Sequence, residues 1–374
     1  MARSAWGTIQ SRGNSVWIRY PAAGGRVTET LPRGSRRRDA ELLLAKRRLE
    51  IEQGTWIRPE TTTLGAFLPE WLKLSGAKDN SLRIYGQCVK RLVGLPWLSA
   101  ITIQKLTINH VERIKRELGG LSPRTLNQTL DVGRQAYSWA LDHGLAHSNP
   151  FAAVKRLPLG ENTKKALEPA QAAALLAELR RTGDPLDSAL AFMLLTLRRY
   201  SEMAGLRWID VDFARRQYTV EQVWLAEQAK FRQADGQKNK RATHELRDAA
   251  LAVLKKQQLT QRTQKYEVEQ AGWAWEEHGL VFTADLGGPV PRSSLRKALT
   301  YACKRVKVPV VELHELRHTG ASILIYAGAD QWQLMAAGGW TSLAMVQRNY
   351  GHLFKSRTAE ALDGLEGLLT RKNA

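Results

Sequence analysis

The spacing of apolar residues changes three times along the chain, and this limits the folds it can adopt more than any other feature. Residues 5–31 alternate apolar and polar positions between turn sequences, as in SVWIRYP, which predicts short strands. Residues 35–54 repeat apolar residues at helical spacing, and the segment from residue 62 predicts helices alone. Helical and strand-like stretches are mixed from residue 167. We therefore expect a multidomain, mainly α-helical protein with small β-sheets and no internal repeat.

The chain of 374 residues is long enough for two or three domains. We expect a basic sheet-plus-helix module at 1–60 and an all-helical domain at 61–155. The stretch SNPFAAVKRLPLGENTKKA carries two prolines and four basic residues, which predicts a linker at 156–166. Residues 167–374 are expected to form a mixed α+β domain that ends in a tail helix.

The charge of the chain indicates the kind of partner it binds. It carries 56 lysines and arginines against 36 aspartates and glutamates, a formal net charge of +20. Such an excess favours a polyanion, because each basic side chain that neutralises a phosphate releases a counterion. The two cysteines, Cys88 and Cys303, suit a reducing compartment. No stretch approaches about eighteen apolar residues, and the N-terminus has no signal-peptide core. We expect a nucleic-acid-binding protein of the cytoplasm, associated with the nucleoid and without a membrane span.

The predicted helix at 35–54 has an apolar and a basic face. The apolar residues expected to face the small sheet are Leu42, Leu43, Leu49 and Ile51. The basic face would then be exposed beside basic strands, which favours contact with DNA. A further basic residue, Arg124, follows Ser122 and Pro123, which suit the cap and the first position of a helix at 122–143. The expected DNA contacts are Arg36, Arg37, Arg38, Lys46, Arg47 and Arg124.

HELRH, residues 314–318, fits two kinds of site. As H-E-x-x-H on a helix, it would place His314 and His318 on one face as zinc ligands, with Glu315 as the general base of a peptidase. Few downstream residues could supply the third ligand, and Arg317 would set a permanent positive charge beside the metal. The zinc peptidase is therefore a distant alternative, and we expect no metal.

The other interpretation of HELRH is a phosphate site. His314 and Arg317 lie three residues apart and share a helix face, and a guanidinium can hold two oxygens of one phosphate. The stretch LLTLRRYSEMAGLRWIDVD offers a second arginine, Arg198 or Arg199, and the spacing to Glu202 favours Arg199. Two arginines would neutralise the charge that develops at phosphorus, and the tyrosine in WTSLAMVQRNYGHLF could be the nucleophile.

In this order, the motifs resemble those of the tyrosine recombinase or phage integrase family. The family's first box, T-G-x-R-x-x-E-x-x-x-L-x-W, is matched at 196–208, and H-x-L-R-H-T-x-A-S is matched by HELRHTGAS at 314–322. Gly-Gly-Trp followed by Tyr-Gly-His, at 338–352, fits the closing box. The resemblance covers nearly the whole chain. It implies a site-specific DNA recombinase, an integrase of a phage or another mobile element, that needs no metal, ATP or other cofactor.

The resemblance also implies a role for each matched residue. Arg199 and Arg317 would clamp the scissile phosphate, and Tyr350 would attack it to leave a 3′-phosphotyrosyl bond and a free 5′-hydroxyl. His314 would contact the phosphate and assist proton transfer. The indole N–H of Trp340 would donate to a non-bridging oxygen.

Family members also carry a lysine in a sheet turn, which would protonate the departing 5′-oxygen. Lys238 fits this position best, with Lys240 and Lys230 as alternatives. The residues expected to support the site by hydrogen bonding are Glu202 and His318. Tyr326, on the same predicted helix as HELRH, is expected in the core.

Two positions depart from the family pattern. Leu197 stands where the family usually has glycine, so the backbone there is expected to approach DNA less closely. Ten residues separate Trp340 from Tyr350, one more than is usual, and one inserted residue turns a helix by about 100°. Tyr350 would then point away from the phosphate unless a loop or bulge absorbs the extra residue, Asn349. We expect Tyr350 still to act. The alternative is a DNA-binding protein on the recombinase scaffold that has lost strand cleavage.

The resemblance assigns a task to each domain. It implies an arm-type DNA-binding domain at 1–60, a core-binding domain at 61–155 and a catalytic domain at 167–374. In the family, a tail such as RTAEALDGLEGLLTRKNA often docks on a neighbouring subunit. The leucines expected on one face of this tail are Leu362, Leu365 and Leu369. We expect double-stranded attachment-site DNA as the partner, a homotetramer on that DNA, and a DNA-bending accessory protein as a possible further partner.

Overall fold

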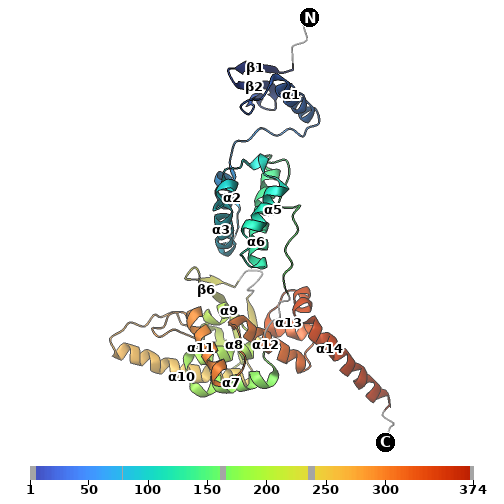
Figure 1. Cartoon of the computed structure of the whole chain (residues 1–374). Helices are drawn as coiled ribbons and strands as arrows, with labels where there is room; N and C mark the ends of the chain where they lie inside the picture. The colour runs from blue at the N-terminus through green and yellow to red at the C-terminus, as the bar shows by residue number, and fades with distance from the viewer. Residues whose placement is uncertain (1–5, 78, 161–165, 235–240, 371–374) are drawn as a thin grey trace. The chain divides into compact units, whose positions relative to one another are not determined.

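The computed structural model describes residues 6–77, 79–160, 166–234 and 241–370. It confirms a helix-rich fold with small sheets (Figure 1). The chain forms two compact units, Met1–Asn162 and Thr163–Ala374, and the division falls within the linker expected at 156–166. None of the described helices is long and apolar enough to cross a membrane.

The first unit begins with a three-stranded antiparallel sheet. Its strands, in order across the sheet, are β1 (Thr8–Arg12), β2 (Ser15–Ala22) and β3 (Gly25–Thr30). Two-residue turns join them, and Gly13 and Gly24 supply the left-handed backbone that such turns favour. Ile18 and Tyr20 alternate along β2 and are buried in the core shared with helix α1 (Arg37–Glu52).

Helix α1 is rotated from the orientation expected for it. Leu42 and Leu49, expected to face the sheet, are exposed. The residues that do pack in this core are Ala40, Leu43, Leu44 and Ile51. Leu43 and Ile51 are therefore confirmed as inward-facing, and the expectation for Leu42 and Leu49 is wrong. The inner face is the one that also carries Arg47.

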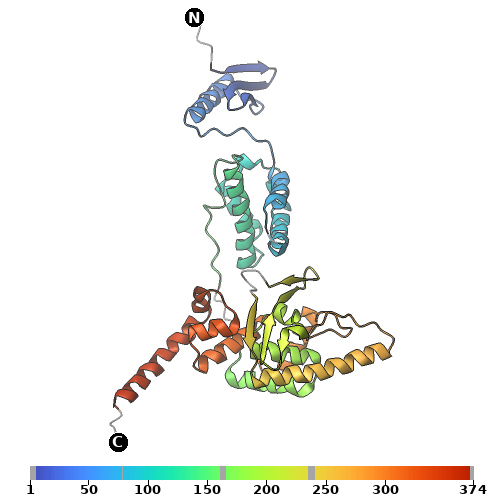
Figure 2. The same cartoon turned by 180° about the vertical axis from the view of Figure 1, so that it is seen from behind.

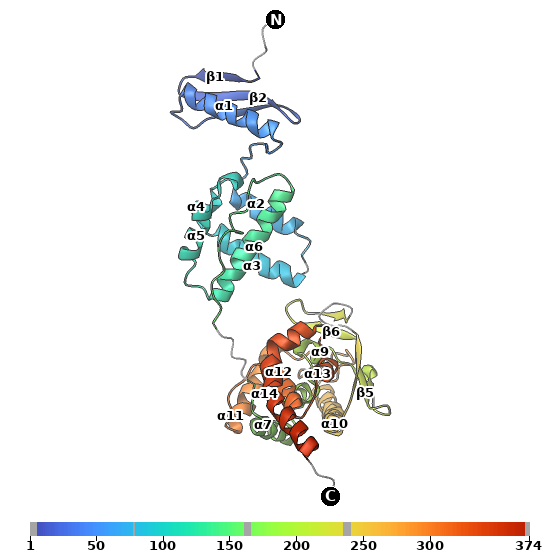
Figure 3. The same cartoon turned by 90° about the vertical axis from the view of Figure 1, so that its right-hand side faces the viewer.

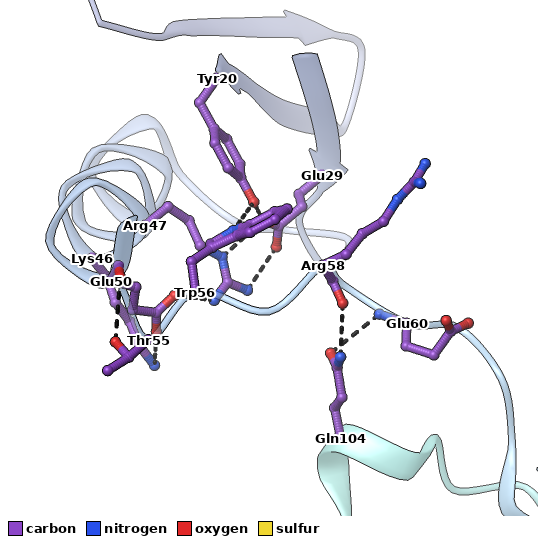
Figure 4. A network of polar contacts seen from close by, with 10 residues as sticks. All are labelled: Tyr20, Glu29, Lys46, Arg47, Glu50, Thr55, Trp56, Arg58, Glu60 and Gln104. Carbon is purple, nitrogen blue, oxygen red and sulfur yellow. Dashed lines mark hydrogen bonds and ion pairs between the residues drawn. The ribbon is translucent and has the colours of Figure 1, made fainter. Parts of the chain in front are cut away.

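Arg47 lies inside the module rather than on its basic surface. Its guanidinium pairs with Glu29 of β3 at 2.8 Å and with Glu50 at 2.7 Å, and only 15% of its side chain is exposed (Figure 4). Tyr20 is hydrogen bonded to Glu29 as well, and Trp56 donates to the Tyr20 hydroxyl at 3.1 Å. Because two carboxylates already satisfy this guanidinium, Arg47 is not the exposed DNA contact that we expected.

The rest of the first unit is helical, as expected. Its elements are α2 (Leu64–Leu74), α3 (Asp79–Val93), α4 (Pro96–Ser99), η1 (Ile103–Lys105), α5 (Ile108–Glu117) and α6 (Pro123–Asp142). Ser122 caps α6 by accepting from the backbone N–H of Thr125, and Pro123 is its first residue, which confirms the predicted helix start. Trp71 is buried in the core of this region, whereas Trp97 and Trp139 are half-buried at its edge.

The second unit combines helices with two small antiparallel sheets. One sheet has the strand order β4 (Val211–Asp212), β5 (Gln217–Val220) and β8 (Ala242–Glu245), and the other pairs β6 (Gln222–Leu225) with β7 (Lys230–Gln233). The helical elements are α7 (Pro169–Thr182), α8 (Pro185–Thr196), α9 (Tyr200–Ala204), η2 (Trp208–Asp210), α10 (Asp248–Gln270), α11 (Arg292–Arg305), α12 (Leu313–Tyr326), α13 (Gln331–Gly338) and α14 (Leu343–Thr370).

Helix α8 is the centre of the second unit. Nearly all its residues are buried, and it packs against α7, α10, α11 and α12. A helix that is apolar on all sides must be enclosed in this way. Its end is therefore fixed by several neighbours, and the residues that follow, Leu197 to Arg199, are held in place with it.

The last three helices form a cluster of their own. α12, α13 and α14 pack against one another around Ile325, Leu334, Trp340 and Tyr350 (Figure 3). Beyond this cluster α14 continues outward from the rest of the unit (Figure 2). The expectation that Tyr326 is a core residue is wrong, since half of it is exposed at the end of α12.

Candidate active site

The chain leaves α8 through a left-handed residue. Leu197 has φ 60° and ends the helix in a conformation that glycine adopts more easily. The next residue but one, Arg199, precedes α9, and the Glu202 carboxylate accepts its backbone N–H at 3.0 Å. The chain therefore makes a left-handed turn at Leu197, the position where the family pattern has glycine.

Space for the Leu197 side chain comes from Gly320 on α12. A Cβ at Gly320 would lie 2.8 Å from Leu197 Cδ2 and 2.8 Å from the carbonyl oxygen of Leu194. Such contacts are too short for real side chains, so α12 approaches the end of α8 closely only because residue 320 is glycine. This approach carries Arg317, one turn earlier on α12, to the same place.

Arg317 is enclosed, with 1% of its surface exposed. Its Nη1 donates to the carbonyl oxygen of Leu197 at 2.6 Å, and its guanidinium carbon lies 4.1 Å from the centre of the Trp340 ring. Its Nη2 has no hydrogen-bond partner among the described residues. Burial, and then the charge of Arg199, lower the pKa of Arg317 to about 9, so it is still protonated at neutral pH.

Arg198 and Arg199 have different environments. Arg198 is buried and donates to the Thr196 carbonyl oxygen at 3.0 Å, to His244 Nε2 at 2.7 Å and to the Ala337 carbonyl oxygen. The guanidinium donors of Arg198 are therefore occupied by other groups of the protein. The side chain of Arg199 is 26% exposed and pairs with Glu202 through Nη1 at 2.6 Å. This difference supports the choice of Arg199 as the phosphate ligand.

The three guanidiniums share one carboxylate. Glu202 also lies 3.8 Å from Arg198, and although burial favours the neutral acid, the charges of Arg198 and Arg199 keep its pKa below the usual value. His244, beside Arg198, has its pKa lowered to about 4 by burial and by that arginine, so it is neutral at pH 7. Counted over the described residues alone, three guanidiniums and one carboxylate leave an excess charge of +2 in the cluster. Such an excess attracts an anion.

Two cavities open at this cluster. One, of about 140 Å³, is lined by Arg198, Arg199, Arg292 and His314 among others. The other, of about 200 Å³, is lined by Arg199, Glu202, His244 and Trp340. Both include Arg199, so a phosphate group placed there would meet the exposed face of its guanidinium.

Tyr350 packs against Trp340, which lines the larger of these cavities. It is buried on α14, its hydroxyl is 2.5 Å from His318 Nδ1, and its ring centre is 5.7 Å from that of Trp340. Burial raises the pKa of the Tyr350 hydroxyl, and the charge of Arg317 opposes this shift. Residues 340–342 form the loop before α14, and Tyr350 lies on α14 with its hydroxyl against His318 of α12. His318 and Tyr350 line a third cavity, of about 200 Å³, together with Tyr326 and Asn349.

The other predicted residues lie in various positions. Lys238, the expected general acid, and Lys240 fall outside the described residues, and Lys230 is exposed on β7. The expected DNA contacts that are exposed are Arg36, Arg37, Arg38, Lys46 and Arg124. His314 is exposed, with its ring centre 4.8 Å from that of His318.

The geometry does not favour the zinc interpretation. Glu315, the general base in that hypothesis, accepts the backbone N–H of Glu312 at 2.7 Å and caps α12. His318 is engaged with Tyr350. Within the described part of the chain, no three histidine, cysteine, aspartate or glutamate side chains gather as a metal site would need.

Sequence analysis missed two residues of this site, His244 and Arg292. His244 lies in RATHEL, which indicated only a strand, and its role depends on Arg198, 46 positions away. Arg292 is the first residue of α11, and a single arginine outside any motif does not indicate a functional site.

Comparison with known proteins gives a consistent result. The profile of the phage integrase family matches residues 165–357, more than half of the chain. The integrase of the element ICEBs1 from Bacillus subtilis (strain 168) is 23% identical over 361 residues, which cover 93% of this chain and 95% of that protein. The integrase of Salmonella phage P22 is 30% identical over 222 residues, covering 56% of this chain and 49% of that one.

Solved structures show the same fold. The Tn1549 transposon integrase in complex with transposon right end DNA superposes with a TM-score of 0.65 at 19% identity, covering 80% of this chain and 98% of that one. A lambda integrase tetramer bound to a Holliday junction gives 0.56 at 15% identity, covering 89% and 92%.

Proposed function

The chain belongs to the phage integrase family, and from this we propose that it is a site-specific DNA recombinase that acts on DNA in the cytoplasm. It cleaves and rejoins double-stranded DNA through a 3′-phosphotyrosyl intermediate. The observation that carries the proposal is the buried cluster of Arg198, Arg199 and Arg317 around Glu202, next to a buried tyrosine.

A phosphodiester suits this cluster electrostatically. It brings one negative charge to a region with an excess of +2, and the partly exposed Arg199 and the unpaired Nη2 of Arg317 can each donate to its oxygens. Trp340 stacks on Arg317 and lines the larger cavity, where its indole N–H would serve as a further donor. Fixed donors of this kind stabilise the charge of a pentacovalent phosphorus without a metal.

In the chemical step, one bond to phosphorus forms and another breaks, and a proton is transferred at both the attacking and the leaving oxygen. The Tyr350 oxygen forms a bond to phosphorus, the bond from phosphorus to the 5′-oxygen breaks, and the tyrosine proton passes to His314. A lysine, Lys238 in our assignment, donates a proton to the 5′-oxygen. In the unbound protein His318 holds the Tyr350 hydroxyl at 2.5 Å, so this hydrogen bond must be exchanged for contact with the phosphate.

Covalent capture of DNA tests the proposal. A duplex selected for binding from a random library, nicked near its centre, should give a denaturant-resistant protein–DNA adduct in the presence of EDTA. Tyr350→Phe should bind the same duplex and give no adduct. Tyr326→Phe, which changes another tyrosine of the same cavity, should behave as wild type.

A second candidate function has an observation in its favour. The Tyr350 hydroxyl is buried and already bonded to His318, so a scaffold that binds DNA without cutting it would also show this geometry. Binding by the wild-type protein without any adduct would select this alternative. EDTA-sensitive peptide cleavage would instead favour the zinc peptidase.

We extend the proposal to the domains. Residues 1–60 would bind arm-type sites and 61–155 core sites, and 167–374 would carry out catalysis. The exposed side chains of Arg36, Arg37, Arg38 and Lys46 support the first assignment, and that of Arg124 supports the second.

A homotetramer on DNA completes the proposal. Leu362, Leu365 and Leu369 are exposed on the outward part of α14, which would leave apolar surface in water if the protein acted alone (Figure 2). Removal of residues 357–374 should weaken synapsis of two DNA sites more than binding of one site. Equal losses in gel-shift assays of one-site and paired complexes would contradict the tetramer.

A further inference from the structure

Arg292 lies at the rim of the smaller arginine cavity. The residues that line the cavity of about 140 Å³ include Arg199, His314 and Arg292, the first residue of α11. No motif of the sequence includes Arg292, and the chemical step proposed above does not use it.

Its position is fixed through Tyr200. The Tyr200 hydroxyl donates to the carbonyl oxygen of Val290 at 2.7 Å, which ties α9 to the segment just before α11. The Arg292 guanidinium carbon lies 5.9 Å from the centre of the Tyr200 ring. Burial raises the pKa of the Tyr200 hydroxyl to about 12, and the charge of Arg292 opposes this shift. Tyr200 directly follows Arg199 in the chain, and Arg199, Tyr200 and Arg292 line the same cavity.

Arg292 also differs from the arginine one turn along α11. Arg296 is neutralised by Glu312 at 2.5 Å, whereas no carboxylate of the described residues pairs with Arg292. An exposed guanidinium beside an anion-attracting cavity, at the positive end of a helix, is placed to receive a second anion. In DNA, the nearest second anion is the next phosphate of the same strand.

We propose that Arg292 binds the backbone phosphate adjacent to the scissile one and so sets which phosphate enters the cluster of Arg199 and Arg317. This rests on the proposed function. Arg292 is then a positioning residue, since it holds the strand and does not touch the reacting atoms. Its role differs from that of Arg199, whose partner is the phosphate that is cut.

The test replaces single phosphates of the selected duplex by uncharged methylphosphonates and measures binding in the Tyr350→Phe background. Arg292→Gln removes the positive charge and the guanidinium donors and leaves a shorter polar side chain. Arg296→Gln is the matched control. We expect one methylphosphonate position to weaken binding about tenfold when Arg292 is present and to have no effect in Arg292→Gln. The salt dependence of binding should fall by about one counterion.

The affected position should be next to the phosphate at which the active protein forms its adduct. If methylphosphonates lower the affinity of Arg292→Gln and the Tyr350→Phe parent by the same factor at every position, the inference is wrong. Equal losses in Arg292→Gln and Arg296→Gln would overturn it as well. Because the binding measurements in the Tyr350→Phe background need no cleavage, their failure is distinct from failure to form the covalent adduct.

Discussion

Replacing Glu202 by glutamine should destabilise the protein by about 3 kcal/mol at neutral pH. Glu202 is the one carboxylate that the described part of the chain places among these guanidiniums, 2.6 Å from Arg199 and 3.8 Å from Arg198. Two unit charges about 4 Å apart attract by about 4 kcal/mol at an effective dielectric constant near 20. Loss of one partner from a buried ion pair costs about 3–5 kcal/mol. Because Arg199 is partly exposed, water recovers some of this loss, and we expect the lower end of the range.

The destabilisation caused by Glu202→Gln should depend on the pH and on the concentration of anions. The folded-state pKa of Glu202 is depressed, so its stabilising contribution is present above the ordinary value of 4.5 and disappears as the pH falls through the folded-state pKa. The difference between wild type and Glu202→Gln should therefore shrink in acid. At neutral pH the variant lacks the carboxylate that pairs with Arg198 and Arg199, so sulfate should raise its stability more than that of the wild type.

Urea unfolding curves at several pH values and sulfate concentrations measure both effects. Sulfate stabilises most proteins without specific binding, so a control is needed. Glu178→Gln supplies it, because Glu178 and Asp187 face Arg181 and Arg305 in a cluster with balanced charge. If Glu202→Gln costs less than about 1 kcal/mol, or if sulfate raises the stability of both variants equally, the charge imbalance of the site is not what we infer.

Three further predictions concern other parts of the structure. Gly320→Ala should destabilise the protein by about 1–3 kcal/mol, since its methyl group would meet the Leu194 carbonyl at 2.8 Å, and thermal unfolding would reveal this. Arg47→Met should cost about 3 kcal/mol because it leaves the carboxylate of Glu29 unpaired; unfolding followed by tryptophan fluorescence should show a loss well above that for the exposed Arg48→Met. Wild-type stability should decrease as the pH is lowered from 6.5 to 4, because His244 takes up a proton in the unfolded chain but stays neutral in the folded protein. Unfolding curves of His244→Gln should show a weaker dependence on pH. An equal slope in the two proteins would contradict the buried neutral histidine.

Short-range patterns in the sequence were enough for several conclusions. The change from alternating to helical spacing placed the first sheet, α1 and the helical region, because each element needs only neighbours a few residues away. The start of α6 followed from Ser122 and Pro123 by the same local chemistry. The three ordered motifs identified the family, since their residue types and spacings are fixed by what the site must contain.

Tertiary structure alone decided which way these elements face. Arg47 points inward because Glu29 lies on β3, and the spacing of residues within α1 gives no information about that carboxylate. Tyr350 contacts His318, 32 positions away on α12, and the residue count between Trp340 and Tyr350 does not reveal this contact.

The different environments of Arg198 and Arg199 were also decided by the tertiary structure. The sequence offered two adjacent arginines, and the partners that distinguish them, His244 and Ala337, are 46 and 139 positions from Arg198. A sequence by itself determines which chemical groups are present and the local elements that carry them. The orientation and charge state of those groups depend on side chains brought together from distant positions, and only the packed fold decides which ones meet.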